Sequence, residues 1–282
     1  MYKRAAKLGD ASAQLKLAKM FLTEFEEKSM MNHDWSLSIS ESLVIADNHK
    51  IALRLFKQAA AAGLPEAVTQ LGHIYETGGY EDEKTGLFYP LVKKNKEKAL
   101  TLYTRGAALG EEGSMNFLGV LQFNSQSTNR EQSVALIRKA AESGNNARAL
   151  NNLAICFEHG HAGCEQNVEK ALQLYEKSAK LGFAPAMVNR AYLHFKVAQQ
   201  SECEFEKSDN FFDCACWLRL ALSRNEDIRE AQYLLGHLYE KGYSVDTNLS
   251  AAFACYKKAA DLGCSRSMTK LGHMFYSGVK VH

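Results

Sequence analysis

Apolar and small residues recur along this chain at the spacing of an amphipathic α-helix. In the segment EAVTQLGHIYETG, residues 66–78, they are separated by four, one and three positions and are Ala67, Leu71, Gly72 and Tyr75. Side chains at these separations lie on one stripe of a helix, which is the stripe that packs against a neighbour. The pattern therefore predicts a helix with one buried face and one polar face.

The same pattern returns along most of the chain. Clear copies occupy residues 66–78, 113–123, 147–160, 230–242 and 266–278, and weaker copies occupy 13–21 and 186–194. A small residue follows the leucine, or its substitute, in every copy: Ala18, Gly72, Gly119, Ala154, Ala191, Gly236 and Gly272. Glycine inside a helix costs about 1 kcal/mol relative to alanine. Its return at one position therefore predicts that a second helix approaches closely there.

A second helical pattern alternates with the first. In its copy YKKAADLG, the side chains of Tyr256, Ala259 and Ala260 share one helix face. Gly263 then fits the left-handed residue that ends many helices. Other copies occupy residues 2–9, 56–63, 137–144 and 175–182, and weaker ones occupy 103–110 and 218–225. In the last of these Asn225 replaces the glycine, and we expect it to adopt the same left-handed conformation.

Together the two patterns form a unit of about 36 residues that occurs seven times. The units fill residues 1–282, so we expect a single solenoid whose first and last units are incomplete. Insertions fall near residues 24–50, 78–96 and 199–213. We expect surface loops there, because a longer loop adds little to the closure entropy. The alternative is that the insertions contact a partner directly, through surfaces such as Trp35 and Phe211–Phe212.

These repeated residues resemble the Sel-one-like repeat, a relative of the tetratricopeptide repeat. The resemblance rests on the Ala, Leu, Gly and Tyr of the first pattern and on the Ala-Ala-x-x-Gly ending of the second. It implies an all-α fold, a right-handed α-solenoid of stacked antiparallel helix pairs. It also implies a general role as an adaptor or scaffold in protein complexes, without naming a partner.

If the units stack like tetratricopeptide repeats, the first helix of each unit lines a concave groove. Groove positions are then those that lie outside the packing stripe of that helix: Asn116, Phe123, Arg148, Asn151, Tyr192, Phe195, Tyr233, His237, Thr269 and His273. Amides, aromatic rings and an arginine suit an extended peptide. A narrower possibility is a clamp for a terminal carboxylate, in which Asn152 and Asn189 act with Arg148 or Arg190. The histidines after the packing glycine, such as His73, His237 and His273, are either a shared site or solvated residues.

Charge and hydropathy exclude several classes of partner. Lysine and arginine number 34 against 32 acidic residues, a net charge of +2, so no general footprint for nucleic acid is present. No run approaches the roughly 18 apolar residues of a membrane span, and the segment MYKRAAKLGD lacks the apolar core of a secretion signal. We therefore expect a cytoplasmic protein, unless the chain is a fragment of a longer one.

One short cluster has the residue types of a zinc site. Cys156, His159, His161 and Cys164 fall within CFEHGHAGC. Cys156, however, aligns with Ile74 on the buried side of the first helix, which favours a core thiol. The seven cysteines also lack the regular pairing of a cysteine-rich bacterial branch of the family, so a β-lactam-type hydrolase is a remote alternative, as is a metal-dependent one. No phosphate-binding glycine loop or activated serine is evident, and we expect neither catalytic residues, metal nor cofactor.

The leading hypothesis is therefore a non-enzymatic adaptor that binds a protein or peptide segment in the groove or through the inserted segments. The alternative is a structural subunit of a large permanent assembly. A permanent subunit should expose an apolar patch and associate with itself when isolated, whereas an adaptor should be monomeric alone.

Overall fold

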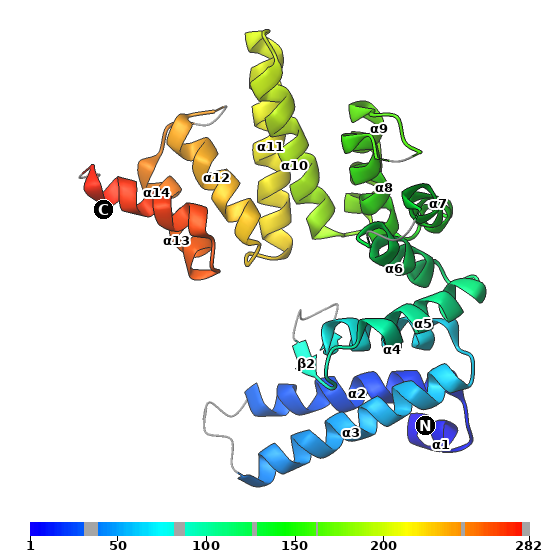
Figure 1. The fold of residues 1–282 in the computed structure, drawn as a ribbon. Helices are drawn as coiled ribbons and strands as arrows, with labels where there is room; N and C mark the ends of the chain where they lie inside the picture. Colours follow the sequence, from blue (N-terminus) through cyan, green and yellow to red (C-terminus); the bar gives the residue numbers. More distant parts are fainter. Residues whose placement is uncertain (31–38, 82–87, 126–128, 162, 244–245, 278–282) are drawn as a thin grey trace. The chain divides into compact units, whose positions relative to one another are not determined.

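The structure is a computed structural model that describes residues 1–30, 39–81, 88–125, 129–161, 163–243 and 246–277. Within these ranges, side chains are described for all residues except those between 23 and 46. Fourteen α-helices and two short strands form the secondary structure of these residues. The chain divides into two compact units, residues 1–142 (unit 1) and residues 143–282 (unit 2). Figure 1 shows the helices coloured along the sequence, from blue at the N-terminus to red at the C-terminus.

Unit 1 contains seven helices and a β-hairpin. In chain order these are α1 (Tyr2–Lys7), α2 (Ala11–Met30), α3 (Ile39–Ala61), α4 (Pro65–Thr77), β1 (Gly79–Glu81), β2 (Phe88–Pro90), α5 (Lys96–Ala108), α6 (Glu112–Phe123) and α7 (Arg130–Ala141). The closest helix pairs are α2 with α3, α4 with α5, and α6 with α7. In each pair a helix of the first pattern packs on the following helix of the second pattern.

Unit 2 contains seven helices and repeats the same arrangement. They are α8 (Ala147–His159), α9 (Val168–Lys180), α10 (Ala184–Gln200), α11 (Glu204–Arg224), α12 (Arg229–Lys241), α13 (Leu249–Asp261) and α14 (Ser265–Tyr276). Helix α8 pairs with α9, α10 with α11, and α12 with α13. The predicted all-α fold of stacked helix pairs is therefore confirmed, with the small hairpin in unit 1 as an addition.

The recurring glycine marks the close approach of two helices, as predicted. A Cβ atom added to Gly72 would lie 2.7 Å from the ring of Tyr103, and one added to Gly236 would lie 3.0 Å from the ring of Tyr256. Both tyrosines are fully buried. The absence of a side chain on the first helix thus leaves room for a tyrosine ring of the second helix. Gly272 on α14 is different, because no described atom lies within 4 Å of its added Cβ.

The ends of the helices follow from local sequence. Asparagine side chains accept a backbone N–H in the first turn of five helices, at Asn95, Asn129, Asn146, Asn167 and Asn248. Gly263 has a φ of 85°, which is the left-handed conformation predicted for it. The prediction for Asn225 is wrong: its φ is −149° and its ψ 110°, so α11 ends by returning to extended backbone.

The insertions do not form the expected loops where they are described. Residues 199–213 are almost entirely helical, because α10 runs on to Gln200 and α11 begins at Glu204. The described parts of the first insertion likewise lengthen α2 and α3. Trp35 lies outside the described residues.

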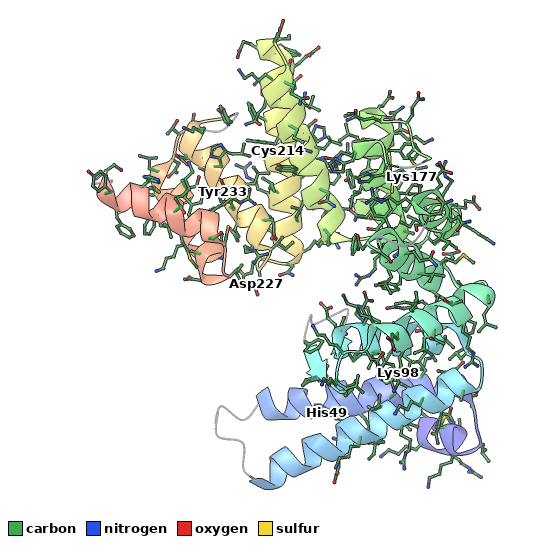
Figure 2. The ribbon with its side chains drawn as sticks, viewed as in Figure 1. His49, Lys98, Lys177, Cys214, Asp227 and Tyr233 are labelled. Atoms are coloured by element: carbon green, nitrogen blue, oxygen red, sulfur yellow. The ribbon has the colours of Figure 1, made fainter. Side chains whose placement is uncertain are left out.

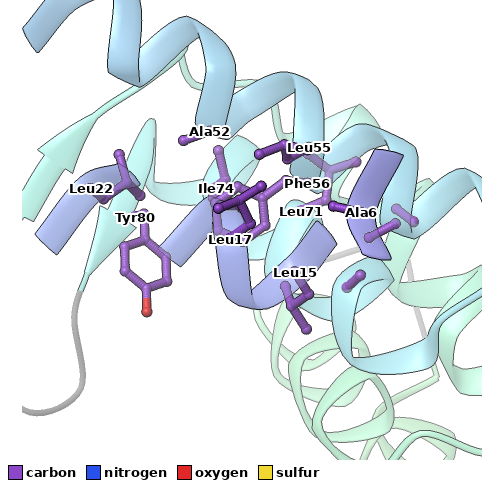
Figure 3. Close-up of a cluster of buried hydrophobic side chains, with 14 of the residues drawn as sticks. Ala6, Leu15, Leu17, Leu22, Ala52, Leu55, Phe56, Leu71, Ile74 and Tyr80 are labelled. Atoms are coloured by element: carbon purple, nitrogen blue, oxygen red, sulfur yellow. The ribbon is translucent and has the colours of Figure 1, made fainter. Parts of the chain in front are cut away.

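The second insertion, residues 78–96, contains the hairpin, in which β1 and β2 pair antiparallel with Tyr80 opposite Tyr89. Both tyrosines are buried and belong to the hydrophobic core of unit 1. Tyr80 lies near Phe56 of α3, with ring centroids 5.6 Å apart. Figure 3 shows Tyr80 beside core residues such as Leu22 and Ile74. The insertion therefore adds core to unit 1 rather than only surface.

Candidate functional site

The structure divides the predicted groove residues into three groups by exposure. The exposed ones are Arg148, Tyr192, Thr269 and His273. The half-buried ones are Phe123, Tyr233 and His237. The buried ones are Asn116, Asn151 and Phe195.

The expected exposure of the three buried residues is therefore corrected. Phe195 packs against Phe211, with ring centroids 5.6 Å apart, because α10 and α11 extend together through the insertion. Asn151 accepts a hydrogen bond from the side chain of Asn189 (2.9 Å) and is thereby placed between α8 and α10. Asn116 is only 2% exposed in the core of unit 1.

Helices α8 and α10 nevertheless present accessible polar side chains and are joined by hydrogen bonds. These side chains are Arg148 and Asn152 on α8 with Asn189, Tyr192 and Lys196 on α10, and we call the surface that they form the α8–α10 face. On each helix these side chains follow at separations of three, four or seven residues, which places them on one side. All five are exposed or half-buried. The face is therefore accessible to a partner.

Hydrogen bonds fix the two helices of this face against each other. The Asn189 amide donates to Asn151, and the Asn151 amide is 3.4 Å from the Asn152 oxygen. Lys196 of α10 donates to Glu158 of α8 at 2.7 Å. Because these bonds connect neighbouring first helices of the repeat, the face has a defined geometry before any partner arrives.

Arginines 148 and 190 have different surroundings, which bears on the predicted carboxylate clamp. The Arg190 side chain is 15% exposed, donates to Glu176 at 2.8 Å and lies 4.5 Å from the centre of the Trp217 ring. Hydrogen bonds from Arg190, together with those from Lys180, lower the pKa of Glu176 to about 2. Arg190 therefore connects α9, α10 and α11. Arg148 is exposed and lies over the Phe183 ring, so it is the arginine that a ligand on this face would meet.

A recurring ion cluster of unit 2 was not predicted. The hydroxyl of Tyr175 donates to Glu158 at 2.8 Å. Lys196, on the first helix of the next repeat, forms an ion pair with the same carboxylate. In the same way Tyr256 donates to Glu240 at 2.5 Å and Lys270 pairs with it at 2.8 Å. Each glutamate thus connects the two helices of its own repeat with the first helix of the next repeat.

The glutamate and tyrosine of this cluster carry a sequence signal. Glu76, Glu158 and Glu240 all stand two residues before the glycine that closes the first pattern. In unit 1, Glu76 accepts a hydrogen bond from Tyr103. Burial opposes ionisation of Glu240, but the bonds from Lys270 and Tyr256 prevail, and its pKa lies below the ordinary value. The return of a glutamate at the same position beside the packing stripe was the sequence signal that could have predicted this cluster.

A hollow of about 530 Å³ lies against the first helices α12 and α14, and we call it the α12/α14 hollow. It contains three predicted groove residues, Tyr233, Thr269 and His273. Its other lining residues are Glu240, Leu249, Arg266, Lys270, Met274 and Ser277. Tyr233 is labelled on α12 in Figure 2. The structure thus brings groove positions of two successive units together around one concavity.

Cys156, Cys164 and Cys214 are buried, whereas Cys203 and Cys216 are exposed. The rings of His159 and His161 lie 5.5 Å apart. Within the described ranges no group of three or more His, Cys, Asp or Glu side chains is arranged to hold a metal ion. Burial raises the pKa of the Cys214 thiol to about 12, so this thiol stays protonated at neutral pH.

The other recurring histidines do not share a site. His73 lies against Phe117, with ring centroids 5.4 Å apart. His237 packs near Phe195 and Tyr243, whereas His273 lines the α12/α14 hollow. As for the bilayer, none of the helices in the described part of the chain is both long and apolar enough to cross it.

A family model described as Sel1 repeat matches this chain at residues 41–64, 65–111, 113–145, 147–183 and 229–264. Chitin synthase regulatory factor 3 of Schizosaccharomyces pombe is 25% identical over 191 residues, 67% of this chain and 19% of that protein. Human protein sel-1 homolog 2 is 29% identical over 154 residues, 54% of this chain and 21% of that protein. The chain thus spans about a fifth of the length of these relatives.

Two solved structures share the fold. The c5321 antigen of uropathogenic Escherichia coli, described as displaying an SLR fold, superposes with a TM-score of 0.66 at 20% identity, covering 100% of this chain and 60% of that one. A Sel1 repeat protein of Oxalobacter formigenes gives 0.65 at 21% identity, covering 84% and 89%. At these identities the likeness concerns the arrangement of helices and not the ligand.

Proposed function

Because the chain belongs to the Sel1 repeat family, we propose that it is a non-enzymatic adaptor that binds a protein segment on the α8–α10 face. The observation that carries this proposal is the accessible row of amide, aromatic and basic side chains across two hydrogen-bonded first helices. A repeat array uses such faces to present a rigid surface to a partner.

Each side chain of the face suits an extended peptide. The amides of Asn152 and Asn189 can exchange hydrogen bonds with a peptide backbone, which always carries both donors and acceptors. Tyr192 is 46% exposed. The Lys196 ammonium lies 5.1 Å from the centre of its ring, and the exposed part of the ring offers apolar surface to a side chain of the partner. Arg148 can take a carboxylate through two parallel N–H donors. The face therefore combines backbone recognition with a preference for certain side chains.

The names of two relatives support a regulatory role. The Schizosaccharomyces pombe protein is called a chitin synthase regulatory factor and a Saccharomyces cerevisiae relative, 31% identical over 120 residues, a chitin synthase regulator. The second covers 42% of this chain and 16% of its own length. We propose that this chain likewise acts on another protein by binding it, in the cytoplasm.

The alternative is a structural subunit of a permanent assembly. It is favoured by the apolar side chains exposed on α14, which are Met268 (52%), Phe275 (69%) and Tyr276 (94%). Light scattering on the purified chain separates the two functions, because a monomer at micromolar concentration fits an adaptor and concentration-dependent association fits a permanent subunit. The hydrolase alternatives gain no support from the arrangement of Cys156 and Cys164.

The double variant Arg148→Ala with Tyr192→Ala tests the proposal. Partners are first recovered with the tagged parent chain, and their affinity is then measured by calorimetry. We expect binding to weaken by at least about 1 kcal/mol, as for central contacts of an interface, while the melting temperature stays within about 2 °C. Lys257→Ala, an exposed change on α13, is the matched control. Equal affinity of the double variant and the control would overturn the proposed face.

A further inference from the structure

Of the two cations that line the α12/α14 hollow, Lys270 forms an ion pair within the described residues and Arg266 does not. Lys270 donates to both oxygens of Glu240, at 2.8 and 3.0 Å. Arg266 stands one turn earlier on α14, is exposed, and makes no ion pair with any residue that the structure describes. Its guanidinium lies 4.7 Å from the centre of the Tyr233 ring. Arg266 is therefore held at the hollow by an aromatic ring. Its charge acts on Glu230 of α12, but Glu230 forms its ion pair with Arg229.

Apolar surface and further polar groups lie beside this charge. Tyr233 is half-buried, Leu249 is 40% exposed and Met274, near the C-terminal end of α14, is buried. Within the described residues neither the Tyr233 hydroxyl nor the His273 ring has a hydrogen-bond partner. The volume of about 530 Å³ is in the range of sites that hold one or two side chains. The hollow thus offers an apolar floor with unfulfilled donors at its rim.

We propose that the α12/α14 hollow binds an internal acidic side chain of a peptide together with a neighbouring apolar side chain. The acidic group faces Arg266, whose planar donors match a carboxylate. The apolar group packs on Tyr233, Leu249 and Met274. This inference rests on the proposed peptide-binding function and adds the chemistry of the ligand at a second place in unit 2.

Charge excludes a basic segment as the ligand. The acidic residue that lines the hollow, Glu240, already accepts bonds from Lys270 and Tyr256, so a lysine or arginine of a partner would approach Arg266 and find no unpaired carboxylate among the described lining residues. A carboxylate removes that imbalance. The gain is greatest in the partly enclosed hollow, where solvent screens less than at an open surface.

A peptide library displayed on phage and selected on the full 282-residue chain tests the proposal. We expect enriched peptides to carry Asp or Glu beside an aliphatic or aromatic residue. As synthetic peptides with an amidated C-terminus, they should lose at least tenfold in affinity when the acidic residue is changed to its amide. Arg266→Glu in the chain should cause a similar loss, and the two changes together should cost less than the product of the separate losses.

Lys257→Glu is the matched control, because it makes the same charge change on the exposed surface of α13. A milder variant, Arg266→Gln, with an unchanged melting temperature guards against unfolding. Three results would each overturn the inference. The enriched peptides could lack acidic residues, or Arg266→Glu and Lys257→Glu could cause equal losses of affinity. Binding could also be lost when only the C-terminal carboxylate of the peptide is amidated. Peptides that bind and respond only to Arg148→Ala with Tyr192→Ala would overturn it and leave the proposed function standing. If no peptide is enriched, both fail.

Discussion

Two glutamates that accept hydrogen bonds from tyrosines, Glu158 and Glu240, join successive helix pairs in unit 2. Glu158 has a side chain only 8% exposed, and it accepts bonds from Tyr175 and Lys196. Burial and the neighbouring Glu158 raise the pKa of the Tyr175 hydroxyl, so it remains a donor at any physiological pH. A buried charge of this kind is stable only while its partners remain. Removing one partner should therefore weaken the fold locally.

Tyr175→Phe removes a single donor from Glu158 and leaves the ring in place. We expect a loss of about 1.5–3 kcal/mol in the free energy of unfolding, as for a hydrogen bond to a charged group. Urea denaturation monitored by circular dichroism measures it. Tyr192→Phe, at an exposed tyrosine, should change stability by less than about 0.5 kcal/mol. Equal effects of the two changes would show that Glu158 does not depend on Tyr175.

A second residue-scale prediction concerns His194, which is 6% exposed. Burial lowers its pKa, although the hydrogen bond with Asn210 and the charge of Asp213, whose carboxylate is 3.9 Å away, oppose the shift, and Arg190 adds to it. The unfolded chain then binds a proton near pH 6.5 while the folded chain does not. Stability is full above that pH and falls as the pH decreases toward the folded pKa.

We therefore expect the free energy of unfolding to fall between pH 7 and pH 5. His194→Gln should reduce that fall, even if it is less stable at pH 7. The exposed His273→Gln is the control and should keep the parent's slope. Denaturation curves at half-unit pH steps measure the effect, and a His194→Gln slope identical to that of the parent would contradict it.

At the scale of elements, the periodic helices were predictable and the insertions were not. The stripe and closing glycine are repeated, so each copy supports the others. The insertion at 199–213 has no second copy, and its helical form depends on contacts such as Phe211 with Tyr243, whose rings stack at 4.2 Å. Apolar residues at 211, 214, 215 and 218 continue a helical stripe, and this signal was outweighed by the expectation of a loop. The strands of the hairpin have three residues each, too few to show a period.

The predicted exposure of Phe195 and Asn151 was wrong for a related reason. The helical phase fixes which side of α10 Phe195 occupies, but not whether another element covers that side. The extended α11 covers the side of α10 on which Phe195 lies, and the amide of Asn189 donates a hydrogen bond to Asn151. Arg148 and Tyr192, by contrast, stay exposed. Exposure is therefore a property of the assembled unit that spacing within one helix does not contain.

Close approach at the packing glycine gives the element-scale prediction. Gly236→Leu places a side chain where the Tyr256 ring already lies 3.0 Å from the added Cβ, and overpacking should cost more than about 1 kcal/mol. Gly272→Leu is the matched change, because its Cβ meets no described atom. Leucine is also the better helix former, so that variant should be neutral or more stable. Thermal melts compare them, and equal destabilisation would contradict the helix-approach model.

At the scale of the whole molecule, each unit has its own hydrophobic core and its own helix pairs. Unit 2 carries both the α8–α10 face and the α12/α14 hollow. Both surfaces are formed mainly by the first helices of successive repeats. In a repeat array stability is approximately a sum of local terms. Surface residues of the first helices can therefore vary without loss of the fold, which suits a protein that recognises a partner.

Hydrogen exchange on the full chain, with and without the partner recovered from its native source, tests most directly whether this face binds. Binding raises the free energy of local opening wherever the partner makes contact. We predict slower exchange in residues 147–159 and 184–200, which form α8 and α10, with little change in α13. Protection confined to other helices, with α8 and α10 exchanging as in the free chain, would contradict the assignment of partner binding to the α8–α10 face.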